Sequence, residues 1–187
     1  MIENVFSIKI LNRFSENTND IKSQVFQSLN NIKFNYNSNW GKTHLLSTKT
    51  FSEDQLSQHN LNLLQSFIDE SLKEYCKSYN IDYKPYDMTS WIALYKSGDY
   101  AHLHNHGEAD ISGVYYIQTH ENSGDIFFSS PSPGAEASSI YKEHKEHYSY
   151  KPKDGLLLMF PGFLNHGTHR NENENDRISI SFNINFK

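Results

Sequence analysis

Residues 177–186 read RISISFNINF, a strict alternation of polar and apolar side chains. This period of two predicts a β-strand with two different faces. A half-buried strand would ordinarily turn Arg177 to water, but two helices upstream need an apolar sheet face to cover. Ile178, Ile180 and Phe182 suit that face. We therefore expect Arg177 and Ser179 to point into the fold, together with the other polar side chains of the strand, Ser181 and Asn183.

Two amphipathic helices are predicted upstream of this strand. Apolar residues recur at helical spacing over residues 21–32. A second stripe runs from Leu56 to Tyr79 without interruption, and Ser52-Glu53-Asp54-Gln55 before it forms a capping box. A short strand is expected before both helices, at residues 5–11.

After residue 85 the sequence changes to short β-rich runs separated by Gly, Pro, Asn and Asp. Helices followed by many short strands predict a mainly β fold, a jelly roll or double-stranded β-helix with helices packed on one sheet. We expect a single domain over residues 1–187, with helical support in 1–84 and the β-helix core in 85–187. The expected strands are residues 88–95, 111–118, 125–129, 148–151, 156–160 and 177–186.

Composition narrows the function classes. The 187 residues are 36% hydrophobic and 14% aromatic, which supplies a core without disulfides. With 17 basic and 22 acidic residues, the chain disfavours nucleic acid as a partner. Cys76 lies beside the second apolar stripe and is expected to be a packed thiol. No basic and apolar leader opens the chain, and the longest apolar run, 156–164, is broken by Pro161-Gly162. We expect a cytoplasmic protein outside the membrane. Formation of a homodimer is compatible with the sequence.

The histidines suggest a metal site. His102, His104 and His106 alternate, and 59 intervening residues separate the last of them from His166. Side chains two apart on a strand share a face, so His104 and His106 can point at one ion. An H-x-H pair with one distant histidine is a common three-ligand site with open positions. A histidine-rich surface loop that binds adventitious metal is the alternative.

Five segments together match one family in order. They are residues 95–100 (YKSGDY), 104–106 (HNH), 112–116 (SGVYY), 155–161 (GLLLMFP, with His166) and 177–183 (RISISFN). From about Trp91 to Phe182 the chain thus resembles the Fe(II)/2-oxoglutarate-dependent oxygenases, specifically the small oxygenases of that superfamily found in bacteria and marine phages. This resemblance implies a double-stranded β-helix and a hydroxylase that uses Fe(II), 2-oxoglutarate and O2, and releases succinate and CO2.

The resemblance also implies residue roles. Iron falls on His104, His106 and His166, and the distal carboxylate of 2-oxoglutarate falls on Arg177 and Ser179. Tyr116 matches a strand tyrosine that contacts the same carboxylate in related prolyl hydroxylases; packing in the core is the alternative. The expected substrate is a small molecule or a peptide. The candidates for its side of the pocket are Trp91, Tyr95, Asn183, Tyr115 and Phe163; for all of these but Asn183, packing in the core is the favoured alternative.

One position departs from the family pattern. The superfamily usually carries Asp or Glu where this chain has His106. Either His106 ligates as a third imidazole, or Asp110 or Glu108 supplies a carboxylate, or His102 takes the place. The first option needs no loop rearrangement, because period-two geometry already places His106 beside His104.

Two rival functions remain. A cupin, which uses a metal without 2-oxoglutarate, would match Gly98 with the H-x-H pair and Gly155 with His166, but it leaves Arg177 without a role. A jelly-roll interaction or carbohydrate-binding module would leave the histidines incidental and would bind no stoichiometric metal.

Overall fold

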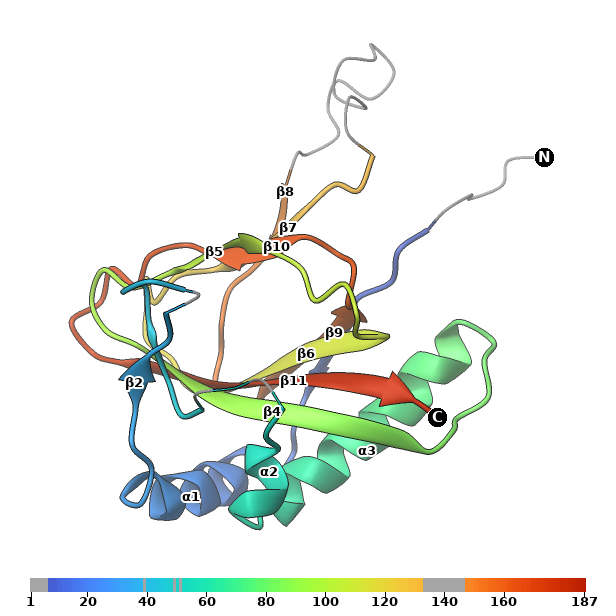
Figure 1. Cartoon of the computed structure of the whole chain (residues 1–187), viewed down its shortest axis with the longest axis horizontal. Helices are drawn as coiled ribbons and strands as arrows, with labels where there is room; N and C mark the ends of the chain where they lie inside the picture. Colours follow the sequence, from blue (N-terminus) through green and yellow to red (C-terminus); the bar gives the residue numbers. More distant parts are fainter. Residues whose placement is uncertain (1–6, 39, 49, 51, 133–146) are drawn as a thin grey trace.

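Two antiparallel sheets face each other and form the body of the molecule (Figure 1). The computed structural model describes residues 7–38, 40–48, 50, 52–132 and 147–187. The larger sheet contains, in spatial order, β1 (Leu11–Phe14), β9 (Leu156–Pro161), β6 (Ile111–Gln118), β11 (Arg177–Phe186), β4 (Tyr86–Tyr95), β3 (Leu45–Leu46) and β2 (Asn35–Tyr36). The smaller sheet contains β5 (Ala101–His104), β10 (His166–Thr168), β7 (Ile126–Ser129) and β8 (His147–Tyr150).

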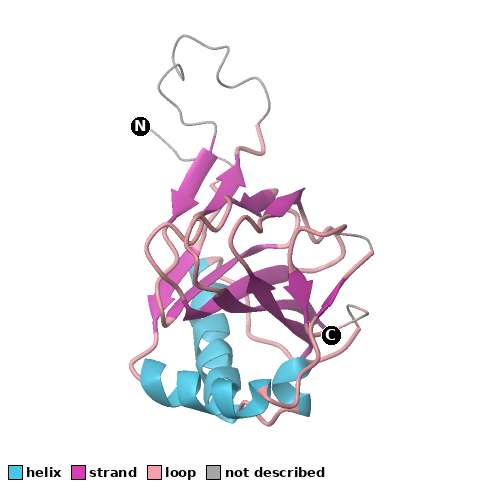
Figure 2. Cartoon of the chain, turned by 90° about the vertical axis from the view of Figure 1, so that its left-hand side faces the viewer, coloured by secondary structure: helices cyan, strands magenta, loops and turns pink. Residues whose placement is uncertain are grey.

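The helices cover only the larger sheet, on the face away from the smaller one (Figure 2). They are α1 (Thr18–Leu29), α2 (Gln55–Gln58) and α3 (Asn62–Ser78). Ile178, Ile180 and Phe182 of β11 pack in the same buried cluster as the helix residues Ile21, Val25, Leu64, Ile68 and Leu72. The predicted mainly β fold with helices on one sheet is confirmed, and so is the inward direction of the polar face of β11.

The prediction of one continuous helix over residues 56–79 is wrong. α2 ends at Gln58, and Asn60 then adopts φ 53°, a left-handed conformation that asparagine tolerates better than most residues. The Leu61 side chain is buried, so the apolar stripe continues through the break while the backbone turns. Asp54 caps α2, accepting a hydrogen bond from the Leu56 amide at 3.2 Å.

Five short strands differ from the expectation. The first strand is Leu11–Phe14 rather than residues 5–11; residues 7–10 are outside it, and residues 5–6 lie outside the described part of the chain. β2, β3, β5 and β10 are not among the expected strands, because two to four residues are too short for an alternating pattern to define a strand.

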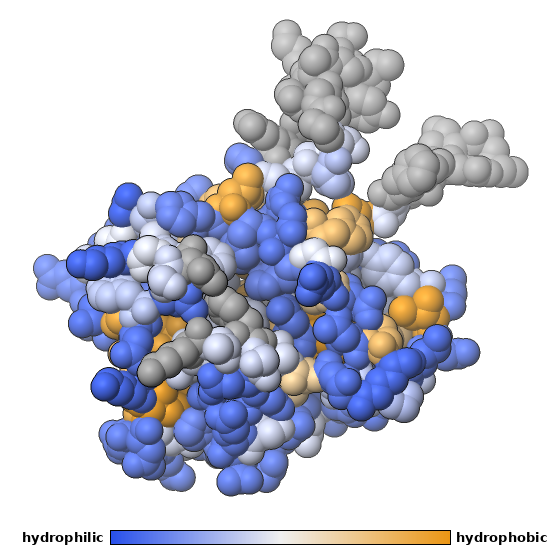
Figure 3. All heavy atoms as spheres, in the orientation of Figure 1, coloured by the Kyte–Doolittle hydropathy of each residue, from blue (hydrophilic) through white to orange (hydrophobic). Residues whose placement is uncertain are grey.

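The surface in the view of Figure 3 is mostly hydrophilic, with apolar side chains in small separate groups. Cys76 is buried, in agreement with the expected packed thiol. Among the described helices, none has both the length and the apolar character that a membrane crossing needs.

Candidate functional site

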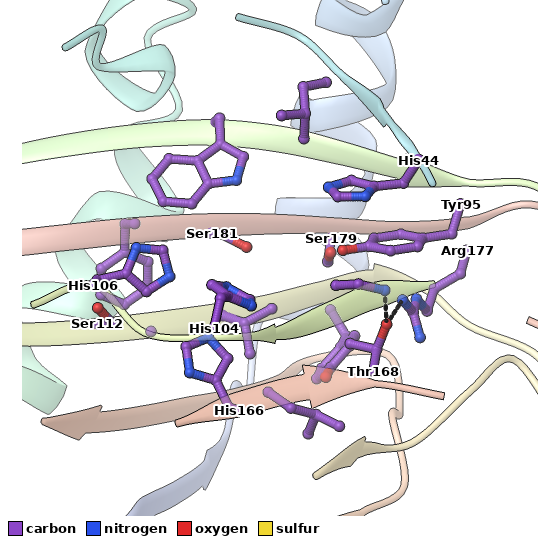
Figure 4. A pocket seen from close by; sticks show the side chains of 18 of the residues that line it. His44, Tyr95, His104, His106, Ser112, His166, Thr168, Arg177, Ser179 and Ser181 are labelled. Atoms are coloured by element: carbon purple, nitrogen blue, oxygen red, sulfur yellow. Dashed lines mark hydrogen bonds between the residues drawn. The ribbon is translucent and has the colours of Figure 1, made fainter. Parts of the chain in front are cut away.

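Three of the predicted histidines lie together at one end of a pocket between the sheets (Figure 4). His104 ends β5, His106 lies in the loop that follows, and His166 begins β10. In the β5–β10 ladder His104 stands opposite His166, with ring centroids 4.2 Å apart. One ligand nitrogen from each of the three rings lies within 4.8 Å of the others. Three imidazole nitrogens this close can bind one metal ion and leave other positions open.

A β-bulge removes His102 from this group. Two residues of β5, His102 and Leu103, stand opposite the single residue Gly167 of β10. The extra residue breaks the alternation, so both His102 and Leu103 are exposed while His104 faces the pocket. A strict period of two across residues 102–106 is therefore wrong.

The two acidic alternatives also point elsewhere. Asp110 is exposed, and its Oδ2 accepts a hydrogen bond from the Phe186 amide at 2.8 Å. Glu108 lies in an exposed turn. Among the described residues, the histidine trio is the only group of three or more potential ligands that could hold a metal ion.

A glycine permits the loop of His106 to reach the site. The His106 amide donates to the Gly162 carbonyl at 2.8 Å, which ties this loop to the segment before His166. A Cβ on Gly162 would lie 2.1 Å from the carbonyl oxygen of Ala109. Only a residue without a side chain fits this close approach.

Burial keeps the imidazoles neutral near pH 7. Desolvation, followed by the charge of neighbouring His104, lowers the pKa of His106 to about 4. Burial likewise lowers the pKa of His104 and brings that of His166 well below its ordinary value. A metal ion binds the unprotonated nitrogen, so the three rings are ready to bind one at neutral pH.

Arg177 lies at the other end of the pocket and is only 1% exposed. Its Nη1 donates to the carbonyls of Ser123 and Gly124, and its Nη2 donates to Thr168 Oγ1. The guanidinium also lies 3.8 Å above the centre of the Tyr95 ring. Among the described side chains, no carboxylate forms an ion pair with it. A buried cation without an anionic partner is costly, which favours an anionic ligand here.

Two unpartnered polar atoms strengthen this interpretation. Arg177 Nε and Tyr116 Oη are both buried, and neither has a hydrogen-bond partner among the described residues. Ser179 stands opposite Tyr116 in the β11–β6 ladder and lines the same pocket. A carboxylate can accept from all three groups, so this end of the pocket fits the distal carboxylate of a small diacid.

The candidates for the substrate side separate into three groups. Trp91 and Tyr95 line the pocket, Trp91 with its ring 5.7 Å from that of His106. Tyr115 faces the helices and packs against Phe67, so the favoured alternative of core packing holds for it. Phe163 is 57% exposed and, like Asn183, is not among the residues that line the pocket.

Sequence reasoning missed two residues of the site, Trp40 and His44. The Trp40 ring contacts that of His104 edge-on, with centroids 4.5 Å apart. His44 stacks on Tyr95 at 4.7 Å, so that His44, Tyr95 and Arg177 form one column (Figure 4). Both residues come from the irregular segment between β2 and β3, where the only signal is an aromatic and a histidine four residues apart.

Comparison with known proteins identifies the family. A family model described as "Putative 2OG-Fe(II) oxygenase" matches residues 89–183, about half of the chain. The chain belongs to this family. It is an Fe(II)- and 2-oxoglutarate-dependent oxygenase, which uses O2 as the oxidant, and the cupin and binding-module alternatives are set aside.

Solved structures show the same fold at low sequence identity. HygX from Streptomyces hygroscopicus, with nickel and 2-oxoglutarate bound, has a TM-score of 0.66 at 12% identity over 96% of this chain and 84% of its own. A prolyl-4-hydroxylase from Pseudomonas putida has a TM-score of 0.63 at 10% identity, and the match covers 97% of this chain and 94% of the hydroxylase. An oxidoreductase of the 2OG-Fe(II) oxygenase family from Burkholderia pseudomallei has a TM-score of 0.67 at 10% identity, and the match covers 94% of this chain and 83% of that protein.

These neighbours confirm the predicted double-stranded β-helix. Among curated proteins, none matches the sequence. Enzymes of this family act on small-molecule or peptide substrates.

Proposed function

We propose that this oxygenase holds Fe(II) on His104, His106 and His166 and binds 2-oxoglutarate through Arg177, Ser179 and Tyr116 while it hydroxylates a C–H bond. The observation that carries this proposal is the buried Arg177. It has no carboxylate partner among the described residues, and it lines the same pocket as the three histidines.

The reaction transfers both atoms of dioxygen. Fe(II) held by the three histidines would supply the redox chemistry that splits O2: one oxygen atom would enter the succinate carboxylate and the other the substrate as hydroxyl, with loss of CO2 from 2-oxoglutarate. The protein supplies the positions of the reactants. Arg177 sets the depth of the cosubstrate, because its Nη1 is fixed by two carbonyls and its Nε remains for the carboxylate.

An all-histidine ligand set changes the charge of the site. Three neutral imidazoles leave the metal with its full double positive charge, whereas the family's usual carboxylate would cancel one unit. The dianionic cosubstrate, binding between the metal and Arg177, offsets two of their three positive charges. We expect 2-oxoglutarate binding to depend on electrostatics at both ends of the pocket.

The substrate approaches from the histidine end of the pocket. Trp91 and Trp40 flank His106 and His104 there, while Tyr95 is stacked under His44 at the cosubstrate end. We assign Trp91 to the substrate side and Tyr95 to the support of Arg177. An aromatic wall beside the metal suits an apolar or aromatic part of a small molecule or peptide.

Anaerobic titration tests the proposal. Adding 2-oxoglutarate to the Fe(II)-loaded protein should produce a visible charge-transfer band, and admitting O2 should release succinate. The matched control is succinate, which has the same distal carboxylate but lacks the 2-oxo group that chelates the metal, and which should give no band. If 2-oxoglutarate also gives no band, the assigned site is wrong.

A further inference from the structure

Two of the three histidines have a fixed ring tautomer. His104 Nδ1 lies 2.7 Å from the His102 carbonyl oxygen, and His166 Nδ1 lies 2.9 Å from that of Leu164. A carbonyl oxygen only accepts hydrogen bonds, so both Nδ1 atoms carry the proton. The lone pair of each neutral ring is then on Nε2, which is left for a metal.

His106 has a different partner. Its Nδ1 lies 3.3 Å from the side-chain amide of Asn183, and the other side of that amide lies 2.8 Å from Ser112 Oγ. An amide group, unlike a carbonyl, can present either a donor or an acceptor. The tautomer of His106 therefore depends on which way the Asn183 amide faces.

The two amide orientations have opposite consequences for metal binding. With Nδ2 toward the ring, as in the structure, Nδ1 of His106 accepts and the proton sits on Nε2, which then has no lone pair for an ion. With Oδ1 toward the ring, Nδ1 keeps the proton and Nε2 is free. The Ser112 hydroxyl both donates and accepts, so it can partner either orientation. The amide oxygen and nitrogen have nearly the same size, so a half turn exchanges them in place.

We propose that Asn183 is the positioning residue of His106: in the metal-binding state its Oδ1 accepts from His106 Nδ1, which leaves Nε2 as the third ligand atom, and Ser112 accepts from the turned amide. This inference rests on the proposed function, since it takes His106 as a ligand. The role proposed here replaces the substrate-side role expected for Asn183. It also explains how a histidine can serve where the family usually has a carboxylate: a carboxylate can always offer a lone pair to the metal, whereas a histidine must have its proton on the other ring nitrogen.

Metal affinity of three variants tests the assignment. Co(II) titrations at pH 7.5, followed by visible absorption, compare the wild type with Asn183→Leu, Asn183→Asp and Asn185→Leu. Asn183→Leu should weaken Co(II) binding about 10–100-fold, the usual effect of losing a partner of a ligating histidine. Asn183→Asp should bind at least as tightly as the wild type, because a carboxylate can only accept from Nδ1. Asn185→Leu, the same change two residues along β11, should leave the affinity unchanged.

A loss of affinity in Asn183→Asp comparable to that in Asn183→Leu would overturn the inference, since it would show that the ring needs a donor. Unchanged affinity in Asn183→Leu would also overturn it. A direct measurement covers the case in which a variant fails to fold. Long-range ¹H–¹⁵N spectra of the Zn(II)-loaded wild type should show the His106 proton on Nδ1, and a proton on Nε2 would contradict the proposal.

His106→Ala separates the two levels of the argument. If this variant binds Co(II) as tightly as the wild type, His106 is no ligand and the proposed function fails at that position. If His106→Ala loses Co(II) while Asn183→Leu keeps it, the ligand set stands and only the role of Asn183 is wrong.

Discussion

The two ends of the pocket are built in opposite ways. At the carboxylate end, Arg177 and Ser179 project from a ten-residue strand with a neighbour on each side, and both are buried. At the metal end, His104 and His106 come from a four-residue edge strand with a bulge and from the loop after it, and both are partly exposed. Under the proposed function, the rigid end recognises a small diacid that never changes, whereas the irregular end leaves room for a substrate and for an unusual ligand.

This contrast also divides the energetics. The carboxylate end contains a buried cation with an unpartnered Nε. Hydrogen bonds to Ser123, Gly124 and Thr168 offset part of the cost of burying this charge, and the proposed ligand would offset the rest. At the metal end, the rings are neutral, and those of His104 and His166 are hydrogen-bonded to carbonyl oxygens. The ligand-free state therefore buries no unpaired charge there. Replacing Arg177 should therefore leave the folded protein as stable as the wild type or more stable. Replacing a histidine of the metal end should remove function without a gain in stability.

The largest effect is expected at His166, which is buried, whereas the other two proposed ligands are partly exposed. His166→Ala should abolish stoichiometric iron binding and all succinate formation, because two remaining imidazoles cannot retain the ion against water. Elemental analysis of untagged protein and a succinate assay measure both. Retained iron at one equivalent would show that the metal lies elsewhere.

Arg177→Met should have the next largest effect, and it should separate binding from stability. Loss of the charge-assisted contact should weaken 2-oxoglutarate binding by ~1.5–3 kcal/mol, or about 10–150-fold, with Co(II) affinity unchanged. Without the ligand, the midpoint of thermal unfolding should stay equal or rise, because the variant buries no unpaired charge. Unchanged cosubstrate binding would remove the assigned role of Arg177.

His44→Phe should have a smaller effect that depends on pH. Burial, and next the Arg177 charge, lower the pKa of His44 to about 4, while the facing His104 and His102 act in the same direction. In the unfolded chain its pKa is near 6.5, so the unfolded state binds the extra proton between pH 6.5 and 4 and wild-type stability falls there as pH decreases. Phenylalanine keeps the stack on Tyr95 without this proton.

Urea unfolding of the metal-free proteins at pH 7.5 and pH 5 measures the difference. Between these values the wild type should lose about 2 kcal/mol more than His44→Phe, from the 1.4 kcal/mol of each pKa unit. The other buried histidines are present in both proteins and cancel in the comparison. Equal losses would mean that His44 accepts its proton in the folded state as readily as in the unfolded chain.

What the sequence could predict follows the same division between regular and irregular backbone. The bounds of β6 and β11 agree with the prediction to the residue, because long strands carry enough alternation to fix both the element and its faces. In β6, Ser112 marks the face toward the pocket, and Tyr115 lies on the opposite face with Ile111 and Ile117, so alternation alone predicts that Tyr115 packs in the core. A periodic pattern contains no information on local backbone turns or long-range packing. It therefore could not predict the helix break at Asn60, the bulge of β5 or the position of Trp40 and His44 beside the site.

The smallest expected effect comes from His102, the residue for which alternation and structure disagree. On a regular strand His102 would share the face of His104, and its loss would weaken metal binding. The bulge turns its side chain to solvent, and only its carbonyl oxygen serves the site, by accepting from His104 Nδ1. A substitution that keeps the backbone should therefore leave Co(II) affinity within about twofold, against the 10–100-fold that loss of a ligand's partner causes. Co(II) titration of His102→Ala beside His104→Ala decides this: a matching loss in both would mean that the edge strand straightens when the metal binds.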